Sequence, residues 1–597
     1  MWEASDMERL GLVCRYIKEH PYCTQRELSQ QLELSLGTVN TLLKECCRRK
    51  FLAQEKSAAG TYELTGLGDR FLDQFLVDGA LIIAAGFGSR FVPLTFETPK
   101  GLLEVFGERM IERQIRQLHQ VGITDITIVV GYLKEKFEYL IDKYNVTLLY
   151  NPEYSHKNTL ATIYHARELL RGRNMYVLSS DNWLRENMFH TWECRSWYSS
   201  VYMEGNTSEW ELHYNKKKRI TEVSIGGKDC WVMYGPVYVS REFSEEFLPL
   251  LETVYQTPGT EQMYWEHVLM NSIDKLEIYI NKQSNQQVYE FENLEELRQF
   301  DPKYQNQSDN KAMELVARIF QTSESEIKNI RCLKSGMTNK SFLFQLKDKQ
   351  YICRIPGPGT ELLISRPQEA KVYEIIEALD ISEKVIYIDG HTGYKIAEYY
   401  EGARTASATC PEDMKACMEV LHCLHKSKIF AGHDFDIRER ILFYEQLCRA
   451  HGGTRFEDYE TVREEMIELI DNLEKLNRPK VLAHIDSNVD NFLILPDGDV
   501  RLIDWEYSGM CDPLIDLGMC AIYSYYSEEQ VEQLMELYFG QPATAKERLV
   551  VYSYMALGGF LWALWAVYKS SLGEEFGDYT LIMYRYAKRY YEKIKKM

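Results

Sequence analysis

A short apolar strand that runs directly into a glycine-rich turn is the feature that most constrains this chain. Residues 80–90 read ALIIAAGFGSR, and apolar runs alternate with amphipathic segments from there to about residue 300. This alternation predicts a doubly wound α/β sheet. Glycines in the turn remove side chains and permit positive φ, so backbone N–H groups can approach phosphates closely. The sequence therefore predicts a phosphate-binding turn at the carboxyl end of a strand.

Bulk composition narrows the protein class. With 597 residues, 45% of them hydrophobic, the chain is long enough for three domains that each bury a core. Its net charge of −20 disfavours nucleic acid or anionic membrane as a partner for the whole surface, although a local basic face remains open. The 14 cysteines lack C-x-x-C pairs, and the N-terminus MWEASDMERL lacks a signal-peptide pattern. We therefore expect a cytoplasmic protein with reduced thiols.

One uncharged stretch, residues 549–568, has about the length that spans a bilayer. It contains two adjacent glycines and several Tyr and Ser residues, and it lies inside the C-terminal domain. We expect a buried helix of that domain, without membrane insertion.

Two basic residues, at the end of the glycine-rich turn and ten positions later along the chain, can contact the phosphates of a nucleoside triphosphate. Arg90 can pair with the β- and γ-phosphates, and Lys100 can balance charge at the α-phosphate as pyrophosphate departs. With Pro93-Leu94-Thr95 and Pro99-Lys100, these spacings resemble the sugar-phosphate and phosphocholine nucleotidyltransferases. The residues expected to contact the nucleotide are Ala85, Gly86, Gly88 and Ser89.

The resemblance also implies a Mg²⁺ site. Asp181, at the end of the apolar strand in YVLSSDN, stands where the family places a metal carboxylate, although the frequent acid two positions earlier is Ser179 here. The second carboxylate is expected in YEFENLEEL, at Glu292 with Glu290 as the alternative; exposed acids at a helix start are the competing interpretation. The substrate's own phosphate would attack the nucleotide, so no protein nucleophile is required.

Finer similarity over residues 80–300 is to the bacterial CTP:phosphocholine cytidylyltransferases rather than the sugar-1-phosphate branch. It rests on segments such as VGYLKEKFEYLIDKY, NTSEWELHY and MYWEHV. The resemblance implies that aromatic faces hold a quaternary ammonium. The residues expected at the substrate are Asn158, Trp210 and Tyr264.

A second chemical signature lies near the C-terminus, in His484-x-Asp486-x-x-x-x-Asn491 followed by Ile503-Asp504-Trp505-Glu506. Asp486 can accept the proton of an attacking hydroxyl, and Asn491 and Asp504 can hold Mg²⁺ ions that bridge ATP phosphates. His484 is expected to position the loop.

This pattern resembles the choline/ethanolamine kinase and aminoglycoside phosphotransferase group over about residues 312–597. The resemblance assigns nucleotide binding to Gly336, Thr338, Asn339, Arg354 and Glu369, with Arg354 and Glu369 as an ion pair. It assigns substrate binding to Trp505, Glu506, Trp562 and Trp565. The last two lie three residues apart on one helix face, where choline kinases wall a trimethylammonium pocket; core packing is the alternative. Tyr568, Tyr584 and Tyr586 are expected to complete this aromatic cage.

Residues 1–76 resemble a winged helix-turn-helix domain. TQRELSQQL predicts a helix that Thr24 caps and Glu27 completes as a capping box, and TVNTLLKECCRRKFL predicts a second helix that presents Asn40, Lys44, Arg48 and Arg49. A hairpin around Gly60 would follow. DNA binding is one interpretation and a docking or dimerisation module the other, because this segment is slightly acidic overall.

Together these features predict a winged helix (α+β) at 1–76, a doubly wound α/β nucleotidyltransferase at 79–305 and a two-lobed α+β protein-kinase-like domain at 312–597. The leading hypothesis is a bifunctional enzyme that makes phosphocholine from choline and ATP, then CDP-choline from phosphocholine and CTP. Ethanolamine or a related amino alcohol is an alternative substrate, and a choline-metabolite-sensing DNA-binding regulator is an alternative function. The sequence leaves a homo-oligomer open.

Overall fold

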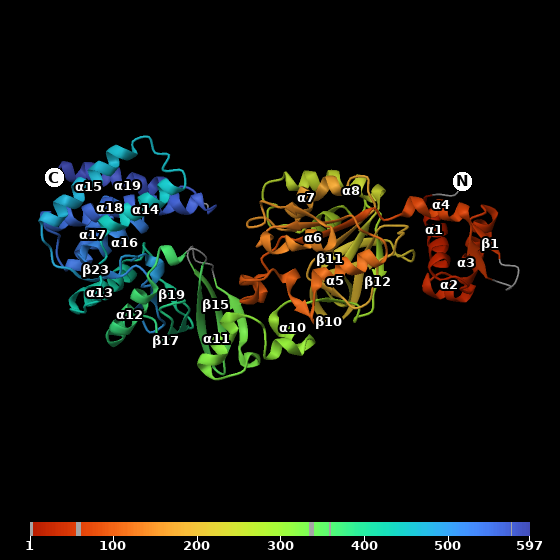
Figure 1. Cartoon of the computed structure of the whole chain (residues 1–597), viewed down its shortest axis with the longest axis horizontal. Coiled ribbons are helices and arrows are strands. Elements are labelled where there is room, and N and C mark those ends of the chain that lie inside the picture. The colour runs from red at the N-terminus through yellow and green to blue at the C-terminus, as the bar shows by residue number, and fades with distance from the viewer. Residues whose placement is uncertain (1–3, 55–60, 334–338, 358–359, 575) are drawn as a thin grey trace. The chain divides into compact units, whose positions relative to one another are not determined.

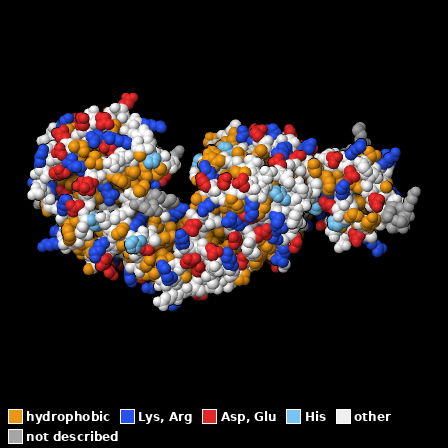
Figure 2. Space-filling view, viewed as in Figure 1, with side chains coloured by type: hydrophobic (Ala, Val, Ile, Leu, Met, Phe, Trp, Pro, Cys, Tyr) orange, Lys and Arg blue, Asp and Glu red, His pale blue; other side chains and the backbone are white. Residues whose placement is uncertain are grey.

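The computed structural model describes residues 4–54, 61–333, 339–357, 360–574 and 576–597. The chain forms two compact units, Met1–Asn310 and Lys311–Met597. Figure 1 shows the first in red to yellow-green and the second in green to blue. On the face seen in Figure 2, acidic and basic side chains are interspersed over each unit, with no extended patch of one sign in view.

The winged helix-turn-helix prediction is confirmed. Thr24 caps the second helix through its hydroxyl, which accepts from the Glu27 amide at 3.2 Å, while the Glu27 carboxylate accepts from the Thr24 amide at 2.6 Å. A short antiparallel hairpin follows the third helix; its expected tip at Gly60 lies outside the described residues. The elements are α1 (Ala4–Glu19), α2 (Gln25–Gln31), α3 (Leu36–Arg48), β1 (Leu52–Gln54), β2 (Tyr62–Leu64) and α4 (Gly66–Leu72).

The first helix, α1, fixes this domain to the rest of the first unit. The Arg15 guanidinium donates to the Glu193 carboxylate at 2.7 Å and to the Trp192 carbonyl at 3.1 Å. The Tyr176 hydroxyl holds the other Glu193 oxygen at 2.9 Å. Gly11 of α1 packs so closely against Cys194 that a β-carbon at position 11 would lie 2.8 Å from the Cys194 sulfur. The contact is therefore tightly packed and contains a buried ion pair.

A seven-stranded mixed sheet, of order β12-β10-β11-β8-β3-β6-β7, forms the core of the remaining part of the first unit. Strands β7, β6, β3 and β8 are parallel, as the alternating pattern predicts. The strands are β3 (Gly79–Ala84), β6 (Ile126–Val130), β7 (Thr147–Tyr150), β8 (Met175–Ser179), β10 (Trp197–Tyr214), β11 (Ile220–Val239) and β12 (Tyr279–Lys282).

Helices cover both faces of this sheet, so the doubly wound prediction is confirmed. One face carries Leu81, Val129 and Val177 against α7 and α8, and the other carries Ile82 and Ile128 against α5 and α6. The helices are α5 (Met110–Gln120), α6 (Tyr139–Tyr144), α7 (Thr159–Leu170), α8 (Arg241–Tyr255), α9 (Glu266–Ser272) and α10 (Leu294–Phe300). The long antiparallel pair β10–β11 departs from the simple alternation and carries several register shifts.

The second unit has the predicted two lobes. Its N-lobe is an antiparallel five-stranded sheet, of order β14-β15-β16-β18-β17, with α12 (Arg366–Ile376) beside it. The strands are β14 (Lys328–Cys332), β15 (Asn339–Leu346), β16 (Lys349–Pro356), β17 (Val385–Ile388) and β18 (Lys395–Glu398). The principal C-lobe helices are α13 (Pro411–Lys426), α14 (Ile437–Ala450), α15 (Tyr459–Lys475), α16 (Leu514–Tyr523), α17 (Glu528–Phe539), α18 (Ala545–Ser571) and α19 (Tyr579–Lys595).

Helix α18 contains the uncharged stretch that sequence singled out. Among the described helices it alone is long and apolar enough to cross a membrane, and 94% of its apolar window is buried inside the unit. Gly558 and Gly559 explain its close packing, because a β-carbon at either position would lie 2.6–2.7 Å from the Met519 sulfur or the Met583 carbonyl oxygen. The helix is the centre of the C-lobe core.

Replacing Arg15 with Ala should lower the free energy of unfolding of the first unit by about 3–5 kcal/mol, because the Glu193 carboxylate would stay buried without its cation. Chemical denaturation measured by fluorescence tests this. Lys18→Ala is the matched control: Lys18 lies on the same helix, but its ion pair with Asp69 is exposed, so about 1 kcal/mol or less is expected. Equal losses for the two variants would contradict a special role for the buried pair.

Candidate active sites

A cavity of about 670 Å³ opens at the carboxyl ends of β3 and β8. Ligands of open α/β sheets bind at such strand ends. It brings together many of the residues that sequence analysis selected: Ala85, Gly86, Gly88, Arg90, Lys100, Asp181, Trp210, Tyr264 and Glu292. Ser89 starts the short helix η2 (Ser89–Phe91) beside the cavity rather than lining it.

The glycine-rich turn is built for a close approach of backbone. Gly88 has φ of +68°, and a β-carbon there would lie 3.2 Å from side-chain carbons of Thr95 and Lys100. Thr95 holds the turn by donating its hydroxyl to the Gly88 carbonyl at 3.0 Å. Gly101, next to Lys100, packs so tightly on Ser180 that a β-carbon would lie 2.6 Å away. Glycine at these positions thus keeps Lys100 against the strand end that carries Asp181.

Two ion pairs organise the charge in this cavity. The Lys100 ammonium lies 2.6 Å from an Asp181 carboxylate oxygen, and the Arg90 guanidinium lies 3.0 Å from Glu292. Burial acts to raise the pKa of Asp181, but Lys100 outweighs it and the pKa is lowered. Glu290 is the opposite case, since burial and the neighbouring Asp181 charge raise its pKa to about 7. Both Glu292 and its alternative Glu290 line the cavity.

The donor set fits a divalent cation, because Asp181, Glu290 and Glu292 supply the carboxylate oxygens that Mg²⁺ prefers. Asp181 and Glu290 are neighbouring carboxylates of like charge, and a bound cation would reduce the repulsion between their anionic forms. Among the described residues, no three His, Cys, Asp or Glu side chains are already grouped around a metal position.

An aromatic corner forms the far side of the cavity. The rings of Trp210 and Tyr264 meet edge to face with centroids 6.5 Å apart. Tyr198 stacks on the buried Trp265 at 6.1 Å. Glu266 also lines the cavity, and its carboxylate accepts from the Tyr198 hydroxyl at 3.1 Å. Burial raises the pKa of Glu266 to about 7.

Sequence reasoning missed Tyr198 and Glu266. Glu266 directly follows Trp265, so an acid next to the aromatic pair was a usable signal, whereas Tyr198 lies on β10, far away in the chain. Asn158 caps α7, accepts from the Thr159 amide at 2.8 Å and joins that helix to residues 261–262. It supports the cavity from outside rather than lining it.

The second unit contains a cavity of about 610 Å³ between its lobes. Its lining includes the following predicted site residues: Asn339, Arg354, Asp486, Asn491, Asp504, Glu506, Trp562 and Trp565. The predicted Gly336 and Thr338 lie outside the described residues.

Asp516 of α16 holds the loop that carries His484 and Asp486. Its carboxylate accepts from the His484 and Ile485 amides at 2.9 and 2.6 Å. The His484 ring bonds the Ile503 carbonyl at 3.0 Å and so ties the loop to the strand before Asp504. Ile485 and Asp504 both adopt positive φ, 72° and 67°, a conformation that costs free energy and is characteristic of functional sites.

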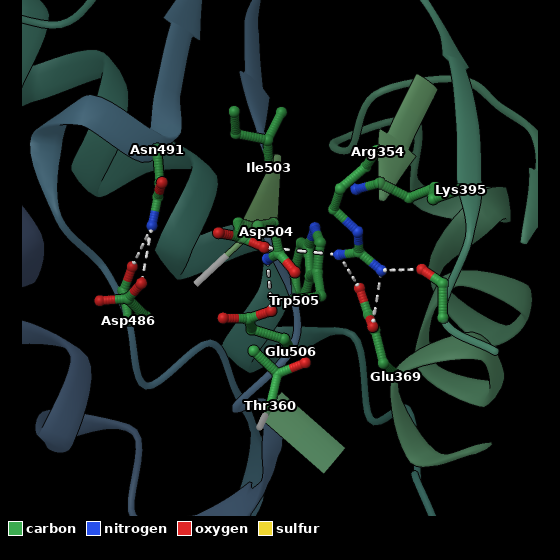
Figure 3. A network of polar contacts seen from close by, with 12 residues as sticks. Arg354, Thr360, Glu369, Lys395, Asp486, Asn491, Ile503, Asp504, Trp505 and Glu506 are labelled. Carbon is green, nitrogen blue, oxygen red and sulfur yellow. Dashed lines mark hydrogen bonds and ion pairs between the residues drawn. The ribbon is translucent and has the colours of Figure 1, made fainter. Parts of the chain in front are cut away.

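Figure 3 shows the polar groups that converge on the cavity. The Asn491 amide donates to the Asp486 carboxylate at 3.1 Å and to its backbone carbonyl at 2.8 Å. These bonds use the Asn491 amide nitrogen and not its oxygen. The Asn491 oxygen and the partly exposed Asp504 carboxylate are oxygen ligands of the kind that Mg²⁺ prefers. Burial raises the pKa of Asp486.

The predicted ion pair of the N-lobe is present. Arg354 binds both Glu369 oxygens, at 2.5 and 2.9 Å, as Figure 3 shows. It also donates to the Gly393 carbonyl at 3.0 Å. Its guanidinium also lies 3.7 Å from Asp504. Arg354 therefore connects the N-lobe sheet to the segment that carries Asp504.

Aromatic rings form the other end of this cavity. Trp562 and Trp565 meet edge to face at 6.2 Å, and Trp562 also contacts Tyr507 at 5.3 Å and Tyr523 at 6.0 Å. Tyr579 completes the lining. Sequence analysis found the two tryptophans, but the tyrosines that it expected, Tyr568, Tyr584 and Tyr586, do not line this cavity. It missed Tyr507, Tyr523 and Tyr579, which come from separate segments of the C-lobe.

Two predicted substrate residues are placed differently. Trp505 is fully buried, packs its ring on His484 at 4.8 Å and donates to the Leu502 carbonyl at 2.8 Å, so it supports the loop and does not line the cavity. Glu506 reaches the cavity, but its carboxylate is bound by Asn339 at 3.0 Å and by Arg366 at 3.2 Å.

Comparison with known proteins agrees with this architecture. Family models match for winged helix-turn-helix DNA-binding (residues 15–51), nucleotidyl transferase (79–193) and the phosphotransferase enzyme family (329–550). The chain is 34% identical to choline-phosphate cytidylyltransferase of Streptococcus pneumoniae, over 38% of this chain and 99% of that protein. It is 35% identical to 2-aminoethylphosphonate cytidylyltransferase of Lancefieldella rimae, over 38% and 92%.

Among solved structures, choline kinase LicA from Streptococcus pneumoniae is 30% identical over 47% of this chain and 97% of its own, with a TM-score of 0.42. The family matches show that the protein is an enzyme with two catalytic domains, which follow an N-terminal winged helix-turn-helix domain along the chain. It belongs to the choline-phosphate cytidylyltransferase family through residues of its first unit, and its second unit is a domain of the phosphotransferase enzyme family.

Proposed function

We propose that this enzyme makes CDP-choline in two steps: the second unit phosphorylates choline with ATP, and the first unit joins phosphocholine to CTP with release of pyrophosphate. The observation that carries the proposal is that each cavity combines phosphate-handling charges with a wall of aromatic rings. A trimethylammonium group has no hydrogen-bond donor, so aromatic faces are its natural binding partners. The product of one step is the substrate of the other.

In the kinase step, the choline hydroxyl loses its proton to Asp486 as its oxygen attacks the γ-phosphorus of ATP, and ADP leaves. Asn491 orients Asp486 through its 3.1 Å hydrogen bond. Arg354, fixed by Glu369, faces the nucleotide end of the cavity. The rings of Trp562 and Trp565 hold the ammonium end.

In the cytidylyl step, a phosphocholine oxygen attacks the α-phosphorus of CTP and the bond to the β-phosphate oxygen breaks. Arg90 binds the departing pyrophosphate, and Lys100 stabilises the charge that develops at the α-phosphate. Trp210, Tyr264 and Glu266 hold the ammonium.

Bound Mg²⁺ would neutralise phosphate charge in both cavities, held by Asn491 and Asp504 in the kinase and by Asp181 with Glu290 or Glu292 in the cytidylyltransferase.

Substrate choice separates this proposal from the amino-alcohol alternative. Trp562, Trp565 and the three tyrosines line the kinase cavity together with Asp486, whose carboxylate is hydrogen-bonded to Tyr523. The aromatic faces favour a trimethylammonium group, whereas a primary ammonium needs hydrogen-bond acceptors, of which Asp486 is one. In the other cavity Glu266 offers such an acceptor, and a relative acts on 2-aminoethylphosphonate by name. Competition assays with choline and ethanolamine, and with their phosphates, test the two units separately.

Asp486→Asn should reduce choline phosphorylation by at least about 100-fold, because it removes the general base, and should leave phosphocholine cytidylylation unchanged. Asp181→Asn should do the reverse. Both activities are measured on each purified variant, so each unit serves as the folding control of the other. Loss of both activities from one substitution in a folded protein would contradict the assignment of separate sites.

Phosphocholine affinity of the first unit should rise with pH through about pH 7, because the Glu266 carboxyl, with its pKa raised to about 7, is neutral below that value and anionic above it. If only the anionic form binds the cation, the dissociation constant falls by up to about fourfold between pH 6.5 and 8. Calorimetric titration measures this. Glu266→Gln should flatten the profile; an unchanged profile in that variant would assign the titration to another group.

The outward face of α3 favours a second function, regulation through duplex DNA. Asn40, Lys44 and Arg48 are exposed, and the acid of this helix, Glu45, is buried against Arg48 and Arg49 at 2.6 Å. Helix α1, not α3, makes the buried contact with the sheet domain. We propose that α3 enters a major groove. A gel-shift assay with genomic fragments should show salt-sensitive binding that Lys44→Ala weakens; no shift at low salt would remove this role.

A further inference from the structure

Arg366, the first residue of α12, is a buried arginine that sequence analysis did not single out. Its side chain is 6% exposed, and it does not line the kinase cavity. Its guanidinium nevertheless reaches four segments of the second unit. The oxygen atoms that it contacts belong to Glu369 at 2.9 Å, Asn339 at 3.1 Å, Glu506 at 3.2 Å and Thr360 at 3.3 Å.

Two of these partners face the cavity directly. Asn339 begins β15, the strand that follows the turn expected over the nucleotide phosphates, and Glu506 lies two residues after Asp504. The Asn339 amide also donates to the same Glu506 oxygen at 3.0 Å. Arg366, Asn339 and Glu506 thus form a closed triangle of hydrogen bonds across the two lobes.

The surroundings are shaped for this guanidinium. Glu369 binds two arginines, since Arg354 takes both of its oxygens and Arg366 shares one. Arg354 extends toward Asp504 and Arg366 toward Glu506, so one carboxylate orients both ends of the Asp504–Glu506 segment. Gly393 has φ of +76°, and a β-carbon there would lie 2.7 Å from the Arg366 Nε.

We propose that Arg366 is a positioning residue of the kinase reaction: it fixes Asn339 and Glu506 relative to each other and thereby holds the nucleotide-binding edge of the N-lobe against the metal-binding segment. The inference rests on the proposed kinase function. A planar guanidinium can bind several oxygens at fixed angles, and lysine cannot reproduce that geometry. Removing the charge would also leave Glu506 and Glu369 short of a cation in a buried position.

The test compares Arg366→Gln and Arg366→Lys by steady-state kinetics with ATP, choline and Mg²⁺. Arg366→Gln should raise KM for ATP about tenfold or more and lower kcat, while KM for choline changes less than about twofold, because the aromatic wall is untouched. Arg366→Lys should lie between wild type and the Gln variant. Lys371→Gln is the matched control, because Lys371 is exposed on the same helix and pairs with Glu374. This variant should leave kcat and both KM values unchanged.

The thermal unfolding of the second unit shows whether an Arg366 variant is folded, and cytidylyl transfer by the first unit shows that the rest of the chain is intact. A folded second unit with a raised KM for ATP means that Asn339 and Glu506 are displaced and not that the domain is unfolded. If Arg366→Gln is unfolded, Arg366→Lys decides. Parallel increases in both KM values, or a lowered unfolding temperature with an unchanged KM for ATP, would overturn the proposal.

A double-mutant cycle with Asn339→Ala adds a second criterion. Because both residues act through one triangle, the loss of kcat/KM for ATP in the double variant should be smaller than the product of the two single losses. Multiplying losses would overturn the proposal. A wild-type protein that forms no phosphocholine would instead overturn the proposed function, so the two failures are distinguishable.

Discussion

Both cavities bring several carboxylates close together, and a few cations pair with these like charges. In the first unit, Lys100 and Arg90 pair with Asp181 and Glu292. In the second, Arg354 and Arg366 share Glu369 and extend to Asp504 and Glu506. Buried charges are stable only when they are paired and hydrogen-bonded. The Lys100–Asp181 pair and the cluster of Arg354, Arg366 and Glu369 therefore hold the strand ends and loops that carry these residues. The Arg90–Glu292 pair is exposed and contributes little.

Those parts of the fold that depend on neighbouring residues were predictable. The Thr24–Glu27 capping box, the strand that enters the glycine-rich turn and the alternation of strands and helices all reflect contacts within a few residues of each other. The same holds for Asp486, Asn491 and Asp504, whose chemistry follows from spacing along one loop and one strand. Their convergence on one cavity agrees with the prediction.

Contacts between distant segments account for what sequence analysis missed. Tyr198 and Glu266 meet across 68 positions of the chain, and Arg366 and Glu506 meet across 140. No local pattern distinguishes such residues from ordinary core or surface positions. Trp505 shows the converse: it belongs to a strong motif, yet it is fully buried with its ring packed against His484, and spacing along the chain does not reveal that burial.

The aromatic rings of both cavities lie beside a carboxylate. In the second unit Asp486 is hydrogen-bonded to Tyr523, and in the first unit Glu266 accepts from the Tyr198 hydroxyl. Rings bind a quaternary ammonium without desolvating a hydrogen-bond donor, while a carboxylate also accepts a primary ammonium. The lining of the two cavities is therefore similar in kind, and only the competition assays separate a quaternary from a primary ammonium substrate.

Phosphorus NMR of the purified protein with choline, ATP, CTP and Mg²⁺ tests the account most directly. The account predicts a phosphocholine resonance that appears first and then declines as CDP-choline and pyrophosphate accumulate. Phosphocholine that persists beside unused CTP would contradict the assignment of the first unit, and unchanged ATP and CTP would contradict both assignments.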